Sequence, residues 1–420
     1  MTMYMLLLVI IFVTFAVVAW RDFRFALTLL FGLLPTYLLR FSIGPVPTTA
    51  LEIFILTLVA IKLVRQPTIY PVSWRMLKPW RVPMLLMFAA ACFSAAHAPD
   101  IFAALGILKA YYVEPLLVLL LCYGALTNDT KRQVQQNYIW PLATSGVLVA
   151  VLGILQYITK LGIPAPWDVE GRITSIFDFP NAVGLFLAPI VAMLVVFLWT
   201  KHNQKLSSFL FPLSSLTLML TAIILSKTEA ALVAIPAALL ITLCISHTPR
   251  RTKILVILLA IVFSTAAFGL SSTVREKLLL ADVSGHARIA IWHETATYLN
   301  DHWLLGAGLS GFPAAIAPYH DATYFEIFQY PHSVLLNIWV ELGLLGVLAT
   351  ILLTMQVAKT VWRHREDSVV LAVCAAFLTM LIHGLVDVPF FKNDLAIFTA
   401  GLLALLIIRS RSDDAIALHE

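Results

Sequence analysis

A histidine and a glutamate interrupt a long apolar stretch near the end of this 420-residue chain, YPHSVLLNIWVELGLLGVL. His332 follows Pro331 at the start of that stretch, and Glu341 lies well inside it. A histidine exchanges a proton near neutral pH, so His332 is a candidate base or phosphate ligand. The alternative is a histidine that only caps the helix or lies at a membrane interface.

An arginine precedes another apolar segment, in the sequence WDVEGRITSIFDFPNAVG. Arg172 lies in this loop, and Pro180 and Asn181 open the segment that follows. A proline in the first helical turn leaves backbone N–H groups facing outward, where they attract an anion. Arg172 is therefore a candidate anion ligand. The alternative is an arginine that snorkels to the membrane surface as an anchor.

A second arginine, Arg288, belongs to the stretch SGHARIAIWHETATYLNDHWLLGAGLSGF. The apolar residues of this stretch recur at helical spacing, at Ile289, Trp292, Ala296 and Leu299. We therefore expect a helix with an apolar face beside Arg288. Tryptophans in such a helix are typical of a membrane interface.

The same region contains patterns that resemble cofactor or metal sites. Gly306, Gly308 and Gly311 form a G-x-G-x-x-G, but no strand precedes them, so the pattern predicts tight turns rather than a dinucleotide site. The nearby histidines and acids match no metal-ligand spacing, and we expect neither a metal nor a cofactor. These residues are His286, His293, His302, His320, Asp301, Asp321 and Glu326.

Membrane helices must position all of these residues. Apolar residues make up 60% of the chain and charged residues 12%, and the mean hydropathy is +0.91. Apolar runs long enough to cross a bilayer recur along the whole length, which predicts an all-α polytopic membrane protein with 12 or 13 spans in a single membrane domain over residues 1–420. The predicted spans are 4–20, 25–41, 47–64, 82–97, 103–125, 138–158, 182–199, 206–225, 230–246, 253–271, 333–357, 369–386 and 393–408.

The basic residues predict the orientation of these spans. Most of the 28 lysines and arginines lie in alternate gaps between spans, which the positive-inside rule makes cytoplasmic. The net charge of +5 is thus a topology signal and does not predict a nucleic-acid partner. Two loops, 158–181 and a large partly helical one at 272–331, then share the extracytoplasmic (periplasmic) side. Span 25–41 contains Pro35 and Arg40 and is the one that decides between 12 and 13.

Other ionisable residues in or near the spans are expected to form structural ion pairs. Lys109 with Glu114, and Lys227 with Glu229, are close enough in sequence for such pairs, as are the charges of HGLVDVPFFKND. Glu341 needs a partner inside the protein, for which Lys109 or Lys227 is a candidate.

The stretch PHSVLLNIWVELGLLG, the arginine before FDFPNAVG, and the segment ARIAIW…LLGAGLSGF together resemble the O-antigen ligase/polymerase family, bacterial membrane glycosyltransferases of the GT-C type. The resemblance covers roughly residues 171–408. Many members carry Ser-Arg-Gly where this chain has LSKTEAALV, so Lys227 is the candidate replacement for that arginine.

This resemblance implies a polyprenyl-diphosphate-linked glycan donor, a glycolipid or glycan acceptor, and chemistry at the outer face of the cytoplasmic membrane without a metal. It implies that Arg172 and Arg288 bind the diphosphate and that His332 serves the reacting centre, so these three are the expected catalytic residues. Arginine suits this role because its planar fork binds phosphate oxygens and keeps its charge. Asn181, Lys227 and Glu341 are expected to support the site.

Two alternatives stay open at this point. Within the family, a ligase and a polymerase are not separated by the sequence, nor are the sugar, the linkage and the oligomeric state given. A glycolipid transporter or flippase is the alternative of another class. Charged residues around a midplane cavity and broken helices in paired halves are typical of transporters. The distinctive basic residues cluster at one surface instead, which favours the enzyme.

Overall fold

A computed structural model describes residues 3–44, 46–65, 78–126, 129–200, 207–320 and 326–410. Apart from one short hairpin, the regular elements of these residues are helices, and the predicted all-α polytopic membrane fold is confirmed. Six helices are long and apolar enough to cross a membrane, and five shorter apolar helices accompany them within the described ranges. The apolar runs fold as helices because only a helix satisfies its own backbone in lipid.

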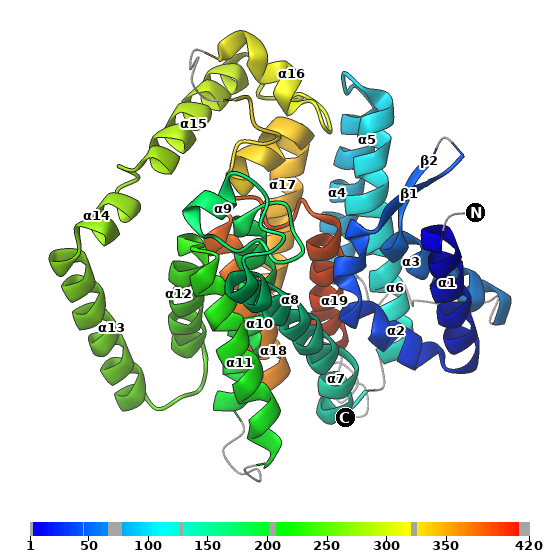
Figure 1. Cartoon of the computed structure of the whole chain (residues 1–420), viewed down its shortest axis with the longest axis horizontal. Helices are drawn as coiled ribbons and strands as arrows, with labels where there is room; N and C mark the ends of the chain where they lie inside the picture. Colours follow the sequence, from blue (N-terminus) through cyan, green and yellow to red (C-terminus); the bar gives the residue numbers. More distant parts are fainter. Residues whose placement is uncertain are drawn as a thin grey trace.

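The N-terminal part of the chain forms the right-hand side of the molecule in Figure 1. Its elements are α1 (Met3–Arg21), α2 (Phe23–Gly32), η1 (Leu34–Leu38), β1 (Arg40–Ile43), β2 (Val46–Thr49), α3 (Ala50–Arg65), α4 (Lys78–Ala96), α5 (Ile101–Leu108), the π turn η2 (Lys109–Val113) and α6 (Glu114–Leu126).

The central and C-terminal parts supply the remaining helices. These are α7 (Lys131–Val134), the π turn η3 (Gln135–Ile139), α8 (Trp140–Thr159), α9 (Trp167–Glu170), α10 (Pro180–Trp199), α11 (Ser207–Leu225), α12 (Glu229–Ile245), α13 (Arg250–Leu270), α14 (Ser272–Leu278), α15 (Val283–His302), α16 (Phe312–Ile316), η4 (Ala317–Tyr319), α17 (Val334–Arg363), α18 (Ser368–His383) and α19 (Asn393–Arg409). Helix α10 begins at Pro180, as the sequence predicts.

Residues 25–41, the segment that decides between 12 and 13 spans, do not form one continuous helix. Helix α2 ends at Gly32, and Pro35 lies in the 3₁₀ turn η1 that follows. The chain then forms the antiparallel hairpin β1–β2, in which Arg40 pairs with Thr49 and Ile43 with Val46. A proline removes a helical N–H and clashes with the preceding turn, which ends the helix before the membrane is crossed.

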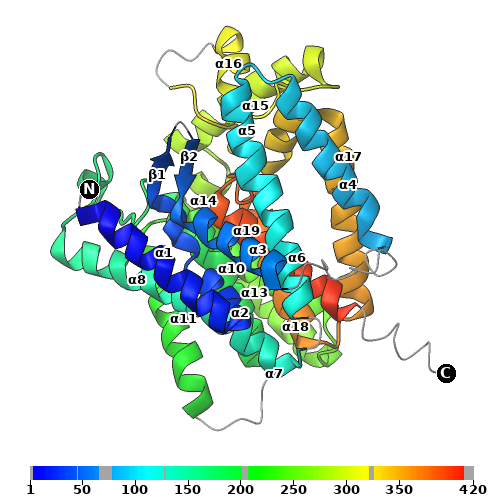
Figure 2. The ribbon, with the colours of Figure 1, turned by 90° about the vertical axis from the view of Figure 1, so that its right-hand side faces the viewer.

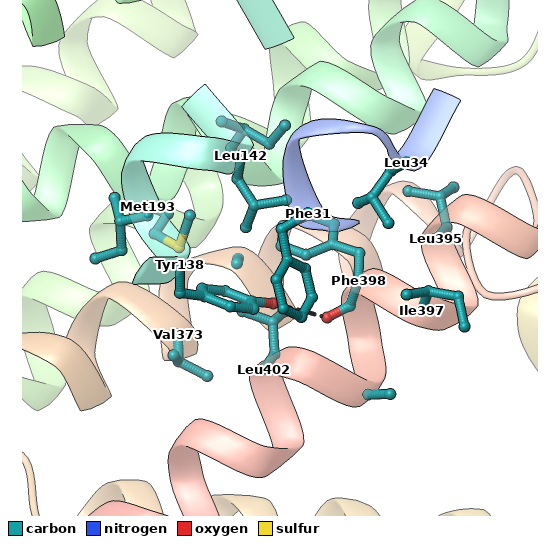
Figure 3. Packing of buried hydrophobic residues seen from close by; sticks show 14 of the residues in the cluster. Phe31, Leu34, Tyr138, Leu142, Met193, Val373, Leu395, Ile397, Phe398 and Leu402 are labelled. Carbon is teal, nitrogen blue, oxygen red and sulfur yellow. Dashed lines mark hydrogen bonds between the residues drawn. The ribbon is translucent and has the colours of Figure 1, made fainter. Parts of the chain in front are cut away.

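The core lies around α18, which packs on α10, α12 and α19, while α10 also packs on α8 and α12. Small residues allow bulky rings to enter this core. Figure 3 shows the Tyr138 ring beside Phe31, with ring centroids 4.4 Å apart, and the Tyr138 hydroxyl donates to the Phe398 carbonyl at 2.9 Å. Gly401 faces the same Tyr138 ring, so a larger side chain there would collide with it. Connections of the candidate site, such as that between α18 and α19, begin and end at helices of this core.

Helices α13, α14 and α15 form an arm beside this bundle (Figure 1). The arm is tied to the bundle by Lys277, whose Nζ lies 3.5 Å from Glu229 and 2.8 Å from Asp282. The predicted apolar face of α15 is partly wrong, because Ile289 and Ala296 are exposed. The buried face instead contains Ile291, Tyr298 and Leu299, which pack against α16 and α17.

Helix α17 is interrupted at Gly343, whose φ of 64° lies in the left-handed region. The loop after α15 packs into this interruption, with Trp303 accepting a hydrogen bond from Trp339 at 2.7 Å and Ala307 donating to the Val340 carbonyl at 2.6 Å. A Cβ at Gly343 would collide with this loop. Helix α4 lies beside α17 on the other side (Figure 2). The loop and α4 therefore fix the direction of α17.

Candidate functional site

His332 is held in place by hydrogen bonds on either side of it. The Trp292 indole donates to the Pro331 carbonyl at 3.0 Å, and the Val334 N–H donates to the Gly384 carbonyl at 2.7 Å. His332 itself has φ 48°, a left-handed conformation that costs a non-glycine residue roughly 1–3 kcal/mol. Helix α15 and the end of α18 therefore impose an unfavourable backbone conformation that directs this histidine.

Asp387, in the connection between α18 and α19, is the partner of His332. Its Oδ1 lies 3.6 Å from the Nδ1 of His332, and the same oxygen accepts the Val388 N–H at 2.9 Å. Burial would raise the pKa of Asp387, but the hydrogen bond and charge of His332, together with the charges of His383 and Lys392, hold this pKa well below its ordinary value. The carboxylate therefore stays ionised and lies nearest Nδ1, so Nε2 is the candidate nitrogen for proton transfer.

Sequence reasoning missed the role of Asp387 and placed it among the structural ion pairs. No spacing rule links it to His332, because the two lie on different connections, and only the fold brings them together. The one available signal was an acidic residue between two apolar spans, in HGLVDV.

Arg288 reaches the same connection from α15. Its Nε donates to the Val386 carbonyl at 3.1 Å, next to Asp387 in the chain. Among the described residues no other hydrogen bond or ion pair engages its guanidinium. We refer to Arg288, His332 and Asp387 as the catalytic group, because the first two are candidate catalytic residues and the third is the partner of His332.

Arg172 belongs to a second cluster, at the start of α10 and the connection between α11 and α12. Its Nε donates to the Ser226 carbonyl at 3.0 Å and its Nη2 to Asn181 at 3.0 Å, while Nη1 lies 3.5 Å from the Glu170 carboxylate. The guanidinium also lies over the Trp167 ring, 5.1 Å from its centroid. Asn181 thus orients Arg172 directly.

Lys227 lies beside Arg172. Its Nζ donates to the Glu170 carbonyl at 2.7 Å, and its φ of 52° turns the chain sharply between α11 and α12. The side chains of Lys227 and Arg172 therefore meet the same residue, and two positive charges lie close together. We define Arg172, Lys227, Asn181 and Glu170 as the arginine cluster.

The arginine cluster and the catalytic group lie at the same end of the helix bundle. The α11–α12 connection holds Arg172 through Ser226 and, one turn later, holds the arm through the contact of Glu229 with Lys277. No hydrogen bond or ion pair among the described residues joins the two groups directly. The structure therefore brings Arg288 and His332 together and places Arg172 in the separate arginine cluster.

Glu341 has different neighbours from those expected. Lys109 pairs with Glu52 at 2.8 Å and Lys227 contacts Glu170, so neither is the partner of Glu341. The Glu341 carboxylate instead receives hydrogen bonds from the Ser310 backbone and the Asn337 side chain. It therefore lies where α17 and the loop after α15 meet.

Two predicted ion pairs are also wrong. Glu114 accepts a hydrogen bond from Asn393 at 3.0 Å rather than pairing with Lys109. Glu229 lies near Lys277 rather than Lys227. The two members of each predicted pair are close in sequence but contact different elements of the fold.

Metal ligands do not gather in the part of the chain that the structure describes, where no three His, Cys, Asp or Glu side chains could hold an ion together. His320 instead pairs with Glu294, with 3.1 Å between Nδ1 and Oε1. Asp321, one of the acids considered as a ligand, lies outside the described residues.

The model of a protein family described as O-antigen ligase matches residues 214–351. This segment is similar to an O-antigen ligase domain. This domain contains Lys227, Arg288, His332 and Glu341, whereas Arg172 and Asp387 lie outside its bounds. A search of curated proteins found no match. The domain supports assignment to the O-antigen ligase/polymerase family and confirms the resemblance found in the sequence.

The O-antigen ligase domain also indicates the general activity. With the apolar helices, it identifies a multi-pass membrane protein of polysaccharide biosynthesis and indicates an enzyme of the glycosyltransferase type. The O-antigen ligase family implies lipid-linked glycan substrates.

Proposed function

We propose that the protein transfers or polymerises a polyprenyl-diphosphate-linked oligosaccharide at the outer face of the cytoplasmic membrane, by a metal-independent displacement that inverts the anomeric centre. The observation that carries this proposal is the catalytic group, in which a histidine beside a buried carboxylate lies near an arginine whose terminal nitrogens have no partner among the described residues. This arrangement supplies a base and a phosphate ligand at one end of the bundle.

The arginines bind the leaving group. Arg288 offers its terminal nitrogens to the diphosphate, because only its Nε contacts the protein among the described residues. Arg172 and Lys227 add two further cations nearby. Charge-assisted hydrogen bonds of this kind neutralise the charge that develops as the bond from the anomeric carbon to the phosphate oxygen breaks.

His332 activates the acceptor. Its Nε2 takes the proton of the acceptor hydroxyl while that oxygen forms a bond to the anomeric carbon, on the face opposite the departing diphosphate. The Asp387 carboxylate stabilises the imidazolium that results. One bond forms and one breaks in a single step, so the product has the inverted configuration.

The test is transfer by purified protein in excess chelator, with the product linkage determined by NMR. We expect undiminished transfer and one inverted anomer, because the cations that neutralise the diphosphate are side chains. A complete loss restored by Mg²⁺ or Mn²⁺, or a retained anomer, contradicts the mechanism. Movement of the glycolipid across the bilayer without a new glycosidic bond supports the transporter instead.

The outward orientation needs a separate test, in a variant without the four native cysteines. Val169→Cys and Val283→Cys place thiols at positions that are 88% and 78% exposed, near the arginine cluster and at the start of α15. Both should react with an impermeant thiol reagent added outside intact cells. Glu366→Cys, in the connection after α17 at the other end of the bundle, should not react. The reverse pattern contradicts outer-face chemistry.

A further inference from the structure

A polar cavity of 650 Å³ adjoins the catalytic group. No residue of the catalytic group or of the arginine cluster lines it. It lies between the hairpin β1–β2, the π turn η2, the loop 177–179 and the α18–α19 connection. Most of its lining falls outside residues 214–351, the part that the family model matches. Short π turns inside α-helices are frequent at functional sites, and η2 supplies one wall here.

The cavity and the catalytic group share two segments of chain. Tyr330 lines the cavity, and its ring centroid lies 5.2 Å from that of His332. Phe391 and Lys392 line it from the same connection that carries Asp387. A molecule in the cavity therefore lies next to the base.

Two buried acceptors in the lining lack a donor. Glu114 and Asn393 are 2% and 7% exposed, and the Asn393 amide donates to Glu114 Oε2 at 3.0 Å. Glu114 Oε1 and Asn393 Oδ1 have no hydrogen-bond partner among the described residues. Buried acceptors without donors are unfavourable, so a ligand that brings several O–H groups gains by entering. Sugars have this chemistry.

The rest of the lining fits an uncharged sugar. The cations Arg40, Lys109 and Lys392 are matched by Glu52, Glu114 and Asp178, and Lys109 pairs with Glu52 at 2.8 Å. Aromatic rings, including those of Tyr37, Tyr111 and Phe179, offer flat apolar surfaces to the C–H faces of sugar rings. Neither Arg172 nor Arg288 lines the cavity, so it is not the place of the diphosphate.

An apolar cavity of 530 Å³ lies next to the polar one. Tyr111 and Phe391 line both, with ring centroids 6.3 Å apart. The apolar cavity extends between α4, α17, α18 and α19, and Val334 lines it just after His332. A molecule with a sugar and a lipid has room for its sugar in the polar cavity, beside the base, and for its lipid in the adjacent apolar one.

We propose that the polar cavity binds the saccharide of a lipid-anchored acceptor and that the apolar cavity holds its lipid. This inference rests on the proposed function and assigns the acceptor to the surface away from the arginines. It requires the attacking hydroxyl to reach Nε2 of His332 from the side of Tyr330.

The direct test is photo-crosslinking with octyl glycosides of neutral sugars that carry a diazirine, on protein in nanodiscs free of sugar detergent. Labels should map by mass spectrometry to 37–49, 109–114 and 177–179. Glu114→Gln and Phe179→Ala should lower the labelling at least fivefold, whereas Glu366→Gln and Phe102→Ala, matched changes outside the cavity, should not. Labelling elsewhere, or labelling insensitive to Glu114→Gln, overturns the inference.

Kinetics separate this inference from the proposed function. Glu114→Gln should raise the KM for a glycolipid acceptor about tenfold, as expected for one lost hydrogen bond, with the KM for the donor unchanged. Transfer with an unchanged acceptor KM rejects the acceptor cavity and leaves the proposed function standing. Glycoside labelling of the cavity in a protein that forms no glycosidic bond rejects the proposed function and leaves a sugar-binding cavity.

Discussion

Arg172 is held on several sides by protein groups, whereas among the described residues Arg288 is held through a single nitrogen. The first has partners for Nε and for both terminal nitrogens, and a ring lies against its face. Within the described part of the chain, the second donates only from Nε, to Val386. An arginine with satisfied donors stabilises the chain around it, and one with unused donors is ready for a ligand.

This difference separates two roles that the sequence treats as equal. Arg172 has fewer N–H donors left for phosphate than Arg288, unless it exchanges the Glu170 carboxylate, which is 48% exposed and thus held weakly. Arg288 needs no exchange. We therefore expect Arg288 to carry most of the donor affinity, and Arg172 to order the loop before α10 and add charge.

The largest effect is expected at the base. His332→Ala should lower kcat by about 10²–10⁴, the usual result of removing a positioned acid–base group. His293→Ala, at an exposed histidine on α15, is the matched control and should retain full activity. Thermal stability of both variants must match the wild type, since unfolding imitates lost catalysis. A folded His332→Ala protein with wild-type turnover eliminates His332 as the base.

One pair of variants tests whether Arg288 and Arg172 have different roles. Arg288→Lys removes the planar fork, and a lost charge-assisted hydrogen bond of roughly 1.5–3 kcal/mol weakens donor binding about 10- to 150-fold. Arg172→Lys should weaken donor binding less and lower Tm more, because its bonds to Ser226 and Asn181 are lost. Donor titration and thermal unfolding of both variants provide the measurement. Equal losses in both quantities would show that the two arginines have one role.

Sequence patterns predicted the helices and the family, but not the side-chain partners of the site residues. Hydropathy alone predicts that apolar runs become helices, because lipid leaves the backbone no other choice. The pairing of His332 with Asp387 depends on how the segment before α17 and the connection between α18 and α19 lie against each other. The local sequence does not determine that arrangement. The hairpin at Arg40 was missed for a similar reason, since its pairing depends on a proline that ends α2 early.

Asp387→Asn tests the orienting carboxylate. Turnover should fall about 10- to 100-fold, the usual cost of losing a group that orients a functional histidine, while donor affinity is kept. The pKa of Asp387 is lower in the folded protein than its ordinary 3.8, so its ionised carboxylate stabilises the fold above that pH and this contribution is lost as the pH falls through the folded-state pKa. The Tm difference between wild type and variant should therefore be present at pH 7 and shrink below about pH 3.8. A pH-independent difference contradicts the ion pair.

The smallest effect is expected for Glu170→Gln. This change removes an exposed partner of Arg172, and such surface pairs contribute about 0–1 kcal/mol. Stability should hardly change, and donor affinity should stay equal or rise slightly, because Arg172 no longer exchanges a carboxylate for phosphate. Donor titration at low and moderate salt measures it. A marked loss of donor binding would mean that Glu170 positions Arg172 for the ligand.

The division of labour between base and phosphate ligand is tested most directly by titrating the polyprenyl-diphosphate-linked donor into folded His332→Ala protein, with Arg288→Ala beside it. The account predicts a Kd within about twofold of wild type for His332→Ala and a Kd more than tenfold weaker for Arg288→Ala. A His332→Ala protein that no longer holds the donor would make His332 a phosphate ligand and contradict its assignment as the base.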